Sequence, residues 1–230
     1  MNTHVTAIIL AAGSGTRMNM NVTKQKIMIG NETVLHRSVR VFNSCGDIDS
    51  IIVVARADEI DFVKAEVSEF DKVIGVTVGG KSRVESAMRG FELVGDKTDF
   101  VAIHDSARCL ISAEMISNVI ADAKIYGAAT ASTKITDTVK EVNEESDILK
   151  TIPRDKLVSV QTPQIFQREL YEKAIRGVDL YDSTVTDDNS LLERIGVFPH
   201  CTETGKNNIK ITTQEDIAFA NFLLERCENV

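Results

Sequence analysis

Residues 6–17 read Thr6-Ala7-Ile8-Ile9-Leu10-Ala11-Ala12-Gly13-Ser14-Gly15-Thr16-Arg17, and the basic stretch Lys24-Gln25-Lys26 follows shortly after. The apolar run from Ala7 to Leu10 is typical of a parallel β-strand that is covered on both faces. Gly13 and Gly15 allow backbone conformations that other residues avoid, so the following turn can bring amide groups close to a ligand. Arg17 and Lys24 supply charge that neutralises phosphate oxygens. The stretch therefore predicts a buried strand ending in a turn suited to a nucleoside triphosphate.

Two common glycine motifs compete for this part of the chain, and both fail on a structural requirement. The dinucleotide fingerprint needs a third glycine where Met18 stands, and it needs an acidic residue after the second strand, at 53–55. The stretch 75–82 matches the formal pattern of a P-loop. A P-loop needs its strand to end before the first glycine, whereas Val73–Val78 is one β-rich run through Gly75. Both interpretations are therefore disfavoured.

Strand-like and helix-like patterns alternate along the chain. The strand-like runs are Val5–Leu10, Ser50–Ala55, Val73–Val78 and Asp99–His104. Apolar residues recur at helical spacing after the third and fourth runs, at Val84, Ala87, Met88, Phe91 and Val94 and at Met115, Ile116, Val119, Ile120 and Ala123. This alternation predicts an α/β fold with a Rossmann-like, doubly wound, mostly parallel sheet. With 230 residues and 43% hydrophobic content, one domain over residues 1–230 is expected.

Capping signals mark two helix starts. Ser112 is placed to cap the helix that begins near Met115, and Thr212 with Glu215 forms a capping-box pattern before the last helix. Residues 133–156 lack a helical or strand-like pattern of that length and contain Pro153 and an acidic run. We expect them to form a projecting hairpin or arm, with a mobile loop as the alternative, and paired arms would produce a homodimer.

The overall charge restricts the classes of partner. A net charge of −8 disfavours broad binding to nucleic acid or to an anionic membrane, so an anionic ligand needs a local cationic pocket. We find no signal-peptide pattern and no apolar run long enough for a membrane span, which predicts a cytoplasmic location. The four cysteines and four histidines are scattered, which favours reduced thiols and argues against a zinc site.

Polar segments follow three of the predicted strands. They are Ala11–Arg17, Gly79-Gly80-Lys81-Ser82-Arg83 and His104-Asp105-Ser106-Ala107-Arg108. In an open parallel sheet, ligands bind outside the carboxyl ends of the strands, so these segments are expected to form one site. Asp105 is the candidate ligand for a divalent metal, because hard cations prefer oxygen and accompany nucleotide phosphates.

Taken together in this order, the motifs resemble the 2-C-methyl-D-erythritol 4-phosphate cytidylyltransferase family. They are Ala11–Arg17, Lys24-Gln25, the stretch from Gly79-Gly80 to Ser86, His104–Arg108, Thr162-Pro163-Gln164 and Asn208-Ile209-Lys210-Ile211-Thr212. The resemblance covers nearly the whole chain, from about Val5 to Leu224. It implies a fold of the nucleotidyltransferase type with a projecting β-arm.

The resemblance also implies a reaction. A cytidylyl group would pass from CTP to the phosphate of methylerythritol phosphate, with release of pyrophosphate, in the non-mevalonate isoprenoid pathway. A phosphate monoester is ionised near neutral pH, so the acceptor supplies its own nucleophile and the enzyme mainly aligns and neutralises charge. By family match, Arg17, Lys24 and Lys210 are the catalytic cations around the triphosphate, and Mg²⁺ or another divalent cation bridges phosphate oxygens.

The family match assigns the remaining site residues to two sides. On the nucleotide side, Gly79, Gly80 and Ser86 would surround cytosine, with Ala11, Ala12, Gly13 and Gly15 near the nucleotide. Without the match, Ser86 could simply bond to the backbone of its own helix. The residues assigned to the polyol-phosphate side are Asp105, Ser106, Arg108, Thr138, Arg154 and Thr162. Supporting roles there are less secure for Asp137, Lys140 and Asp187. Thr138 and Arg154 would belong to an arm that reaches toward the partner subunit, which implies a homodimer.

The sequence departs from the family pattern at three positions. Thr23 and Cys109 stand where the family commonly has proline, and Lys26 replaces a residue that is often aromatic. Loss of proline removes a backbone restraint, which could loosen Lys24 and Arg108. If so, Cys109→Pro would improve acceptor affinity.

Two other functions stay open at this point. One is a cytidylyltransferase that acts on ribitol 5-phosphate, which would use the same phosphate chemistry with a different acceptor pocket. The other is a catalytically silent nucleotide-binding regulator on the same fold. The joint presence of Arg17, Lys24, Asp105 and Lys210 argues against the regulator, because binding alone tolerates the loss of groups needed only in the transition state.

Overall fold

The computed structural model describes residues 3–13, 23–177 and 185–228. Its strands are β1 (Val5–Leu10), β2 (Met28–Ile29), β3 (Glu32–Thr33), β4 (Ser50–Ala55), β5 (Val73–Val78), β6 (Phe100–Asp105), β7 (Ala128–Lys134), β8 (Val139–Val142), β9 (Ile148–Ile152), β10 (Val158–Gln167) and β11 (His200–Glu203). Its helices are α1 (Val34–Ser44), α2 (Ile60–Glu66), α3 (Arg83–Phe91), α4 (Ala113–Tyr126), α5 (Arg168–Ile175), α6 (Asp188–Glu193) and α7 (Gln214–Glu228). Short 3₁₀ turns lie at Lys24–Lys26, Ala57–Glu59 and Arg154–Lys156.

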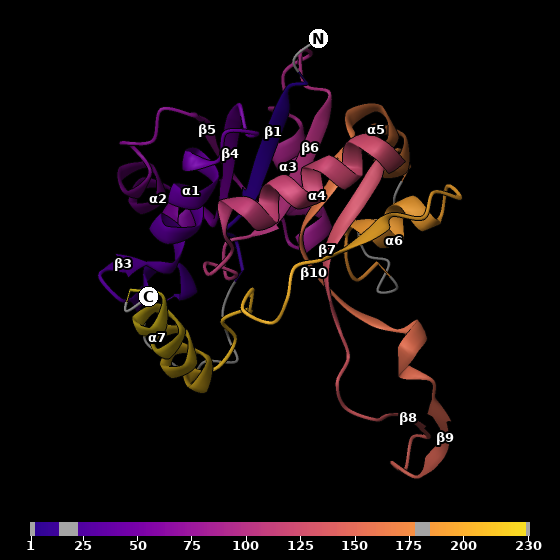
Figure 1. Ribbon diagram of the computed structural model, residues 1–230. Helices are drawn as coiled ribbons and strands as arrows, with labels where there is room; N and C mark the ends of the chain where they lie inside the picture. The colour runs from indigo at the N-terminus through magenta and orange to yellow at the C-terminus, as the bar shows by residue number, and fades with distance from the viewer. Residues whose placement is uncertain (1–2, 14–22, 178–184, 229–230) are drawn as a thin grey trace.

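A seven-stranded sheet forms the centre of the molecule, in the order β11-β7-β10-β6-β1-β4-β5 (Figure 1). The pairs β1–β4, β1–β6, β4–β5 and β7–β11 are parallel, and β10 runs antiparallel to β6 and β7. The predicted mostly parallel α/β sheet is therefore confirmed. The four predicted strands are present, and the fourth is displaced by one residue, to Phe100–Asp105.

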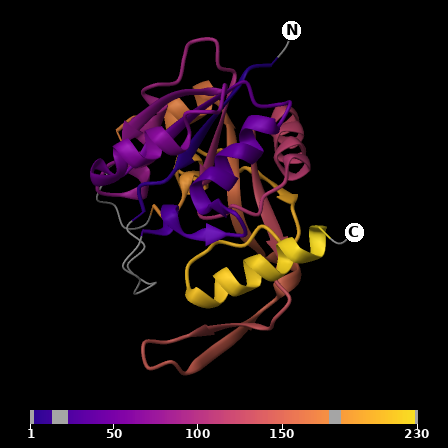
Figure 2. The ribbon, with the colours of Figure 1, turned by 90° about the vertical axis from the view of Figure 1, so that its left-hand side faces the viewer.

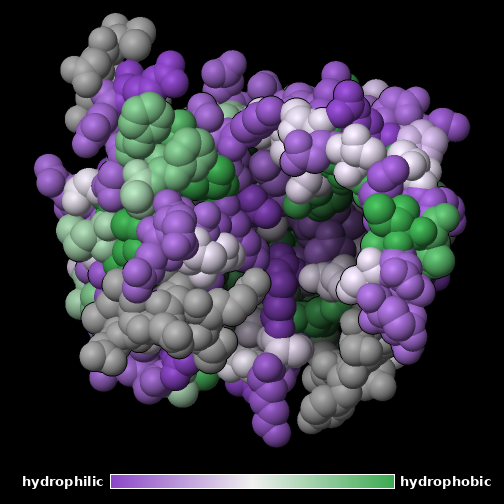
Figure 3. Space-filling model, turned by 90° about the horizontal axis from the view of Figure 1, so that it is seen from below, coloured by the Kyte–Doolittle hydropathy of each residue, from purple (hydrophilic) through white to green (hydrophobic). Residues whose placement is uncertain are grey.

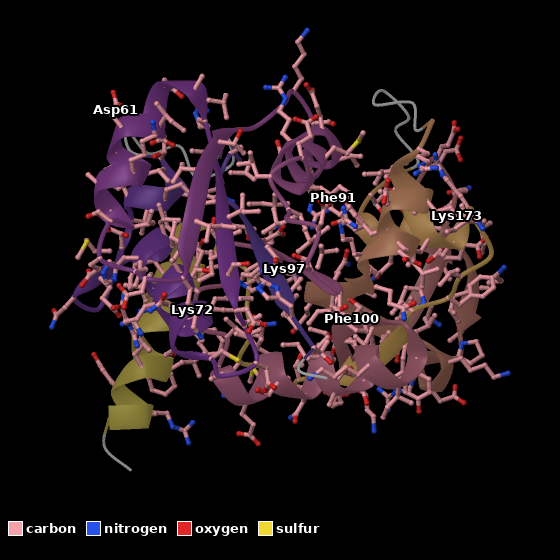
Figure 4. The ribbon with its side chains drawn as sticks, turned by 90° about the horizontal axis from the view of Figure 1, so that it is seen from above. Asp61, Lys72, Phe91, Lys97, Phe100 and Lys173 are labelled. Atoms are coloured by element: carbon pink, nitrogen blue, oxygen red, sulfur yellow. The ribbon has the colours of Figure 1, made fainter. Side chains whose placement is uncertain are left out.

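Side chains of β1 alternate between two apolar cores, because neighbouring residues of a strand point to opposite faces. Ala7 and Ile9 pack with residues of α1, α2 and α4, whereas Ile8 and Leu10 pack with residues of α3, α5 and α6. Both sets are buried, as the continuous apolar run predicts. Figure 4 shows this two-sided cover from above, with Phe91 of α3 and the helix α4 on opposite sides of the sheet.

Helix α3 packs unusually close to the sheet. A Cβ atom added at Gly90 would stand 2.5 Å from the Ile8 Cγ2 atom and 2.8 Å from the Val54 Cγ2 atom. Only glycine allows this approach without displacement of β1 and β4. The C-terminal turn of α3 is thereby held against β1 and β4.

A third apolar cluster joins the C-terminal helix α7 to the β2–β3 ribbon. It contains Ile27, Ile29, Val34, Cys109, Ile211 and Ala220. The sequence-based cap of α7 is wrong by one residue: Thr213 Oγ1 accepts from the Asp216 amide, and the Asp216 carboxylate accepts from the amides of Thr212 and Thr213. Thr212 and Glu215 also place a threonine three residues before an acidic residue. The sequence pattern alone therefore does not show which of the two pairs caps the helix.

Strands β8 and β9 form a separate hairpin that projects from the end of the sheet (Figures 1 and 2). The hairpin lies within residues 133–156, and the chain leaves and re-enters the sheet through β7 and β10. In both views the N-terminus is at the opposite end of the molecule. None of the helices in the described part of the chain is both long and apolar enough to cross a membrane.

Candidate active site

A pocket of about 710 Å³ opens at the carboxyl ends of β1, β4, β5 and β6. This is where a doubly wound sheet is expected to bind ligands. Seen from below, this end of the molecule has a central hollow in which hydrophilic and neutral residues predominate (Figure 3). The predicted site residues that line it are Ala12, Gly13, Lys24, Gly79, Gly80, Ser86, Asp105, Ser106 and Lys210.

A smaller pocket of about 290 Å³ adjoins the first and takes in the start of β10 and the segment before α6. Arg108, Thr162 and Asp187 line it. The two pockets share Arg83, Asp105 and Lys210. These three charged side chains therefore mark the junction at which ligands in the two pockets would meet.

The junction is organised by the Asp105 carboxylate at the end of β6. Arg83 Nε donates to Asp105 Oδ1 over 3.1 Å, and Lys210 Nζ lies 2.6 Å from Asp105 Oδ2. Burial would raise the pKa of Asp105, but Arg83 and Lys210 outweigh it and hold that pKa well below its usual range. Asp105 is thus ionised at neutral pH and draws both cations to the junction.

Arg83 is also tied to the core behind the pocket. Its Nη1 atom donates to Asp188 Oδ2 over 2.5 Å, and the Tyr171 hydroxyl donates to Asp188 Oδ1 over 2.9 Å. Asp188 and Tyr171 are fully buried, and burial together with Asp188 raises the pKa of Tyr171. A buried carboxylate needs such partners, because an unpaired buried charge costs several kcal/mol. Asp188 therefore fixes the guanidinium that Asp105 shares.

Lys24 enters the pocket from the 3₁₀ turn Lys24–Lys26. Gln25 is buried beside it, and its Oε1 atom accepts from the Ser106 hydroxyl over 2.8 Å. The Ser106 hydroxyl also lies 2.9 Å from the Leu10 carbonyl oxygen. Ser106 accordingly links the lysine turn to the end of β1 and has a structural role in addition to lining the pocket.

Gly79, Gly80 and Ser86 form one unit at the end of β5. A Cβ atom at Gly79 would stand 2.6 Å from the Ala12 Cβ atom, so the backbone approaches the β1 turn as only glycine allows. The Ser86 hydroxyl accepts from the Gly80 amide over 3.1 Å and donates to the Ser82 carbonyl over 2.9 Å. The backbone bond expected of a helical serine is present, and the same hydroxyl fixes the glycine turn.

The smaller pocket contains a second buried network. Thr162 Oγ1 accepts from the Asp105 amide over 3.0 Å and lies 3.1 Å from His104 Nδ1. Arg108 Nη1 donates to the Asn208 carbonyl over 2.8 Å, while its Nε atom is buried without a hydrogen-bond partner in the described part of the chain. Burial lowers the pKa of Arg108, with Arg83 acting in the same direction. A phosphate is the kind of ligand that would satisfy this donor.

Some predicted site residues are not brought to the pockets. Thr138 and Arg154 lie exposed on the arm, where an Arg154 Nη1 atom donates to the Thr136 carbonyl. Ala11 is buried under the β1 turn and its amide donates to the Val54 carbonyl. Gly15 and Arg17 lie outside the described residues.

Comparison with known proteins decides between the functional alternatives. The family model for IspD, 2-C-methyl-D-erythritol 4-phosphate cytidylyltransferase, matches residues 5–226. The chain belongs to this family. It is therefore a cytidylyltransferase of the nucleotidyltransferase class, and the resemblance suggested by the sequence motifs is confirmed.

Individual relatives support the assignment over the full chain. A 2-C-methyl-D-erythritol 4-phosphate cytidylyltransferase from Alkaliphilus oremlandii is 38% identical over 221 residues, covering 95% of this chain and 94% of the relative. One from Clostridium tetani is 39% identical over 229 residues, covering 97% and 92%. The crystal structure of a 4-diphosphocytidyl-2C-methyl-D-erythritol synthase from Anaerococcus prevotii superposes with a TM-score of 0.86 at 31% identity, covering 98% of this chain and all of that one.

A divalent metal is implied by the family's chemistry, and Asp105 was the candidate ligand. Within residues 3–13, 23–177 and 185–228, no group of three or more His, Cys, Asp or Glu side chains could hold a metal ion. Mg²⁺ is usually bound by one or two carboxylates together with substrate phosphates. One carboxylate at the junction of the two pockets, that of Asp105, matches the protein's share of such a site.

The three departures from the IspD pattern have defined surroundings. The Thr23 hydroxyl donates to Glu59 Oε1, and Lys26 Nζ lies 3.5 Å from the same oxygen. Lys26 Nζ also lies 4.7 Å from the centroid of the Phe62 ring. Cys109 is buried in the apolar cluster beneath α7, and burial raises the pKa of its thiol to about 12. Thr23 and Lys26 therefore make polar contacts that proline or an aromatic ring would not reproduce in kind.

Sequence reasoning missed Arg83 and Gln25. Arg83 was part of a polar segment but received no role, because its partner Asp188 is 105 residues away in sequence. Gln25 adjoins Lys24 in the sequence, and nothing in its sequence neighbours indicates the bond to Ser106. A cation in the first turn of a helix that follows a parallel strand was the available signal for Arg83.

Proposed function

We propose that the larger pocket binds CTP, that the smaller pocket binds 2-C-methyl-D-erythritol 4-phosphate, and that the cytidylyl group is transferred between them at the junction. The products are 4-diphosphocytidyl-2-C-methyl-D-erythritol and pyrophosphate, in the non-mevalonate isoprenoid pathway. The observation that carries this proposal is the sharing of Arg83, Asp105 and Lys210 by two adjoining pockets. Two anionic substrates repel each other, so a transfer between them requires that both reach a shared group of cations.

The acceptor provides the nucleophile in this reaction. An oxygen of its phosphate monoester attacks the α-phosphorus of CTP, a new P–O bond forms, and the bond to the β-phosphate oxygen breaks. The bonding electrons leave with pyrophosphate. The protein's tasks are to hold the two phosphates in line and to neutralise their charge, which is the main source of catalysis in phosphoryl and nucleotidyl transfer.

The cations of the junction are suited to these tasks. We assign Lys24 and Lys210, together with Arg17, to the triphosphate and to the charge that develops at the α-phosphate. Lys210 Nζ contacts Asp105 in this structure, and Asp105 keeps Arg83 as a second partner when Lys210 turns to a phosphate. Asp105 thereby orients Lys210 at the junction. Its negative charge stays paired with Arg83 when Lys210 moves to a phosphate.

The nucleotide base would lie against the glycine turn at the end of β5. Gly79, Gly80 and Ser86 form one wall of the pocket there, and Ala12 lies directly against Gly79. A pocket that hydrogen-bonds the edge of cytosine rejects a base that leaves its polar groups unpaired, at a cost of about 1–3 kcal/mol per group. We propose that this wall selects cytosine.

The acceptor side would use Arg108, Ser106 and Thr162 of this subunit. Thr138 and Arg154 are proposed to act on the partner subunit's acceptor pocket, because the arm carries them away from the body of their own chain. This proposal makes the active protein a homodimer. A bound Mg²⁺ would be held by substrate phosphates and Asp105, and it would supply further charge neutralisation. The cytoplasmic location stays a prediction from the sequence.

Acceptor and nucleotide competition tests the function. Purified protein with Mg²⁺ is given CTP and either methylerythritol phosphate or ribitol 5-phosphate, and pyrophosphate and the mass of the nucleotide product are measured. We expect product with methylerythritol phosphate and CTP, and at least tenfold lower kcat/KM with UTP. Selectivity for ribitol 5-phosphate would contradict the acceptor assignment, and CTP binding without pyrophosphate release would favour the silent regulator.

A further inference from the structure

Glu59 is a buried carboxylate just behind the larger pocket. It ends the 3₁₀ turn Ala57–Glu59 that follows β4, and its side chain is 3% exposed. Its turn neighbours Ala57 and Asp58 line the pocket, whereas Glu59 points away from it into the protein. A carboxylate in such a place is costly unless polar partners are brought to it.

Two polar groups that contact the Glu59 carboxylate come from one short segment. The Thr23 hydroxyl donates to Glu59 Oε1, and Lys26 Nζ lies 3.5 Å from the same atom. Thr23 and Lys26 immediately flank Lys24 and Gln25. Lys26 Nζ also lies over the ring of Phe62, 4.7 Å from its centroid, and Phe62 belongs to the helix that begins directly after Glu59. Glu59 and α2 thus hold the lysine turn at both of its ends.

The lysine turn has little to fix it by itself. It is a single 3₁₀ turn, closed by the bonds from the Lys26 amide to the Thr23 carbonyl and from the Ile27 amide to the Lys24 carbonyl, over 3.1 and 3.3 Å. Such turns have poorer hydrogen-bond geometry than an α-helix, so contacts from outside the turn add to its stability. On the inner side this support is the Gln25–Ser106 bond. On the outer side, Glu59 contacts Thr23 and Lys26, and the Val34 amide donates to the Ile27 carbonyl over 2.8 Å.

We propose that Glu59 is a positioning residue for Lys24, which it serves by clamping Thr23 and Lys26 on either side. The proposal rests on the assignment of Lys24 to the triphosphate. A lysine side chain is long and has many rotamers, so its ammonium group is placed accurately only if its backbone is fixed. A displacement of about 1 Å can cost two orders of magnitude in a reaction that depends on alignment.

Thr23 offers a way to separate this role from simple stability. Its φ angle is −73°, which lies within the range that proline enforces. Proline at this position would stiffen the start of the turn without any bond to Glu59. If Glu59 acts by positioning, Thr23→Pro should therefore restore what Glu59→Gln loses.

The test compares Glu59→Gln, Thr23→Val and Thr23→Pro/Glu59→Gln with the unchanged protein. Glu66→Gln is the matched control, because Glu66 accepts from the Thr33 hydroxyl over 2.6 Å in a similar pair that lies away from the pocket. Three quantities are measured for each protein: kcat and KM with CTP, affinity for inorganic tripolyphosphate, and amide hydrogen exchange of residues 23–27. Thermal melting is recorded so that activity is compared well below each transition.

We expect Glu59→Gln and Thr23→Val to lower kcat/KM for CTP by roughly tenfold, to weaken tripolyphosphate binding and to speed exchange of residues 23–27. The double variant should recover most of the loss, and Glu66→Gln should change none of these values. A Glu59→Gln protein that is less stable but equally active, or a double variant without recovery, would overturn the proposal. Thr23→Val decides the matter if Glu59→Gln does not fold.

The outcome can be told apart from a failure of the proposed function. If the unchanged protein releases no pyrophosphate, the transferase assignment fails. Tripolyphosphate binding and hydrogen exchange do not depend on turnover, so they still show whether Glu59 fixes the lysine turn. Unaltered exchange of residues 23–27 in both Glu59→Gln and Thr23→Val would refute the positioning role even in an active enzyme.

Discussion

Charged side chains from distant parts of the sequence meet at the junction of the two pockets. Lys210 is 105 residues from Asp105, and the carboxylate holds the lysine in place over 2.6 Å. The motifs predicted that both residues belong to the site. They did not predict the role of Arg83, because its second partner, Asp188, is fixed only by tertiary packing. The sequence thus predicts which residues at the strand ends belong to the site. It does not predict which buried groups orient them.

Loss of the Lys210 ammonium group should mainly affect the chemical step. We expect Lys210→Met to lower kcat by about 100-fold or more, because a cation aimed at developing charge is stronger in the transition state than in the ground state. Steady-state kinetics of pyrophosphate release measures this. The control is Lys206→Met, an exposed lysine of the same loop that does not line the pocket. Equal activity of the two variants would remove Lys210 from the catalytic set.

The buried imidazole of His104 should make stability depend on pH. His104 is fully buried, with its ring 4.8 Å from that of Phe42, and burial lowers its pKa to about 3. In the unfolded chain its pKa is about 6.5, so the unfolded state binds the additional proton between these values. Stability contributed by neutral His104 is therefore complete above about pH 6.5 and falls as the pH is lowered toward 3.

His104→Gln should reduce that dependence. Below about pH 5.5 the single group contributes a slope of up to about 1.4 kcal/mol per pH unit, and the variant lacks it. Urea unfolding between pH 4.5 and 7 measures both slopes in a range above the ordinary titration of most carboxylates. Parallel pH profiles for the two proteins would contradict a neutral, buried His104.

Among the helices, α3 contributes both to the stability of the fold and to the lining of the larger pocket. Ser82 caps α3, with its hydroxyl accepting from the Glu85 amide over 3.0 Å, and it also lines the larger pocket. Ser112 caps α4 in the same way: its hydroxyl accepts from the Met115 amide, with a distance of 3.2 Å. Ser112 does not line that pocket. The sequence predicted the Ser112 cap correctly but misplaced that of α7 by one residue, because threonine and an acidic residue occur in two overlapping registers.

The two caps allow a matched comparison. We expect Ser82→Ala and Ser112→Ala each to lower the free energy of unfolding by about 1 kcal/mol. Only Ser82→Ala should also weaken CTP binding, because the first turn of α3 carries Arg83 and holds the glycine turn through the Ser82 carbonyl. Chemical denaturation and calorimetric titration with CTP check both parts. An equal effect of the two variants on CTP affinity would contradict the pocket assignment.

In the molecule as a whole, four of the seven strands of the central sheet were predicted from the sequence, whereas β7, β10 and β11 were not. Strands β1, β4, β5 and β6 are long apolar runs, so their positions follow from the sequence with at most a shift of one residue. The arm is exposed on both sides, with side chains such as Val142, Ile148 and Leu149 more than half exposed. Within residues 3–13, 23–177 and 185–228, these apolar groups stay more than half exposed, which is consistent with the proposed pairing of arms in a dimer.

Mixed dimers test whether the arm serves the partner subunit. Arg154→Ala and Lys24→Met should each be nearly inactive. If Arg154 acts across the interface, subunit exchange in an equal mixture creates one intact site in every mixed dimer, and about a quarter of the wild-type activity should return. Sedimentation confirms that exchange has occurred. No recovery in mixed dimers would show that Arg154 acts within its own chain or not at all.

In the proposed reaction, this pocket pair joins CTP to methylerythritol phosphate by means of its cations. Its most direct test is a single-turnover experiment with excess protein, Mg²⁺, CTP and methylerythritol phosphate, in which pyrophosphate and the mass of the nucleotide product are followed in time. The same experiment uses Lys24→Met and, as control, Lys64→Met on the outer helix α2. We predict stoichiometric 4-diphosphocytidyl-2-C-methyl-D-erythritol from the unchanged protein and from Lys64→Met, with a rate at least 100-fold lower for Lys24→Met. Absence of product from the unchanged protein, or an equal rate for Lys24→Met, would contradict the account.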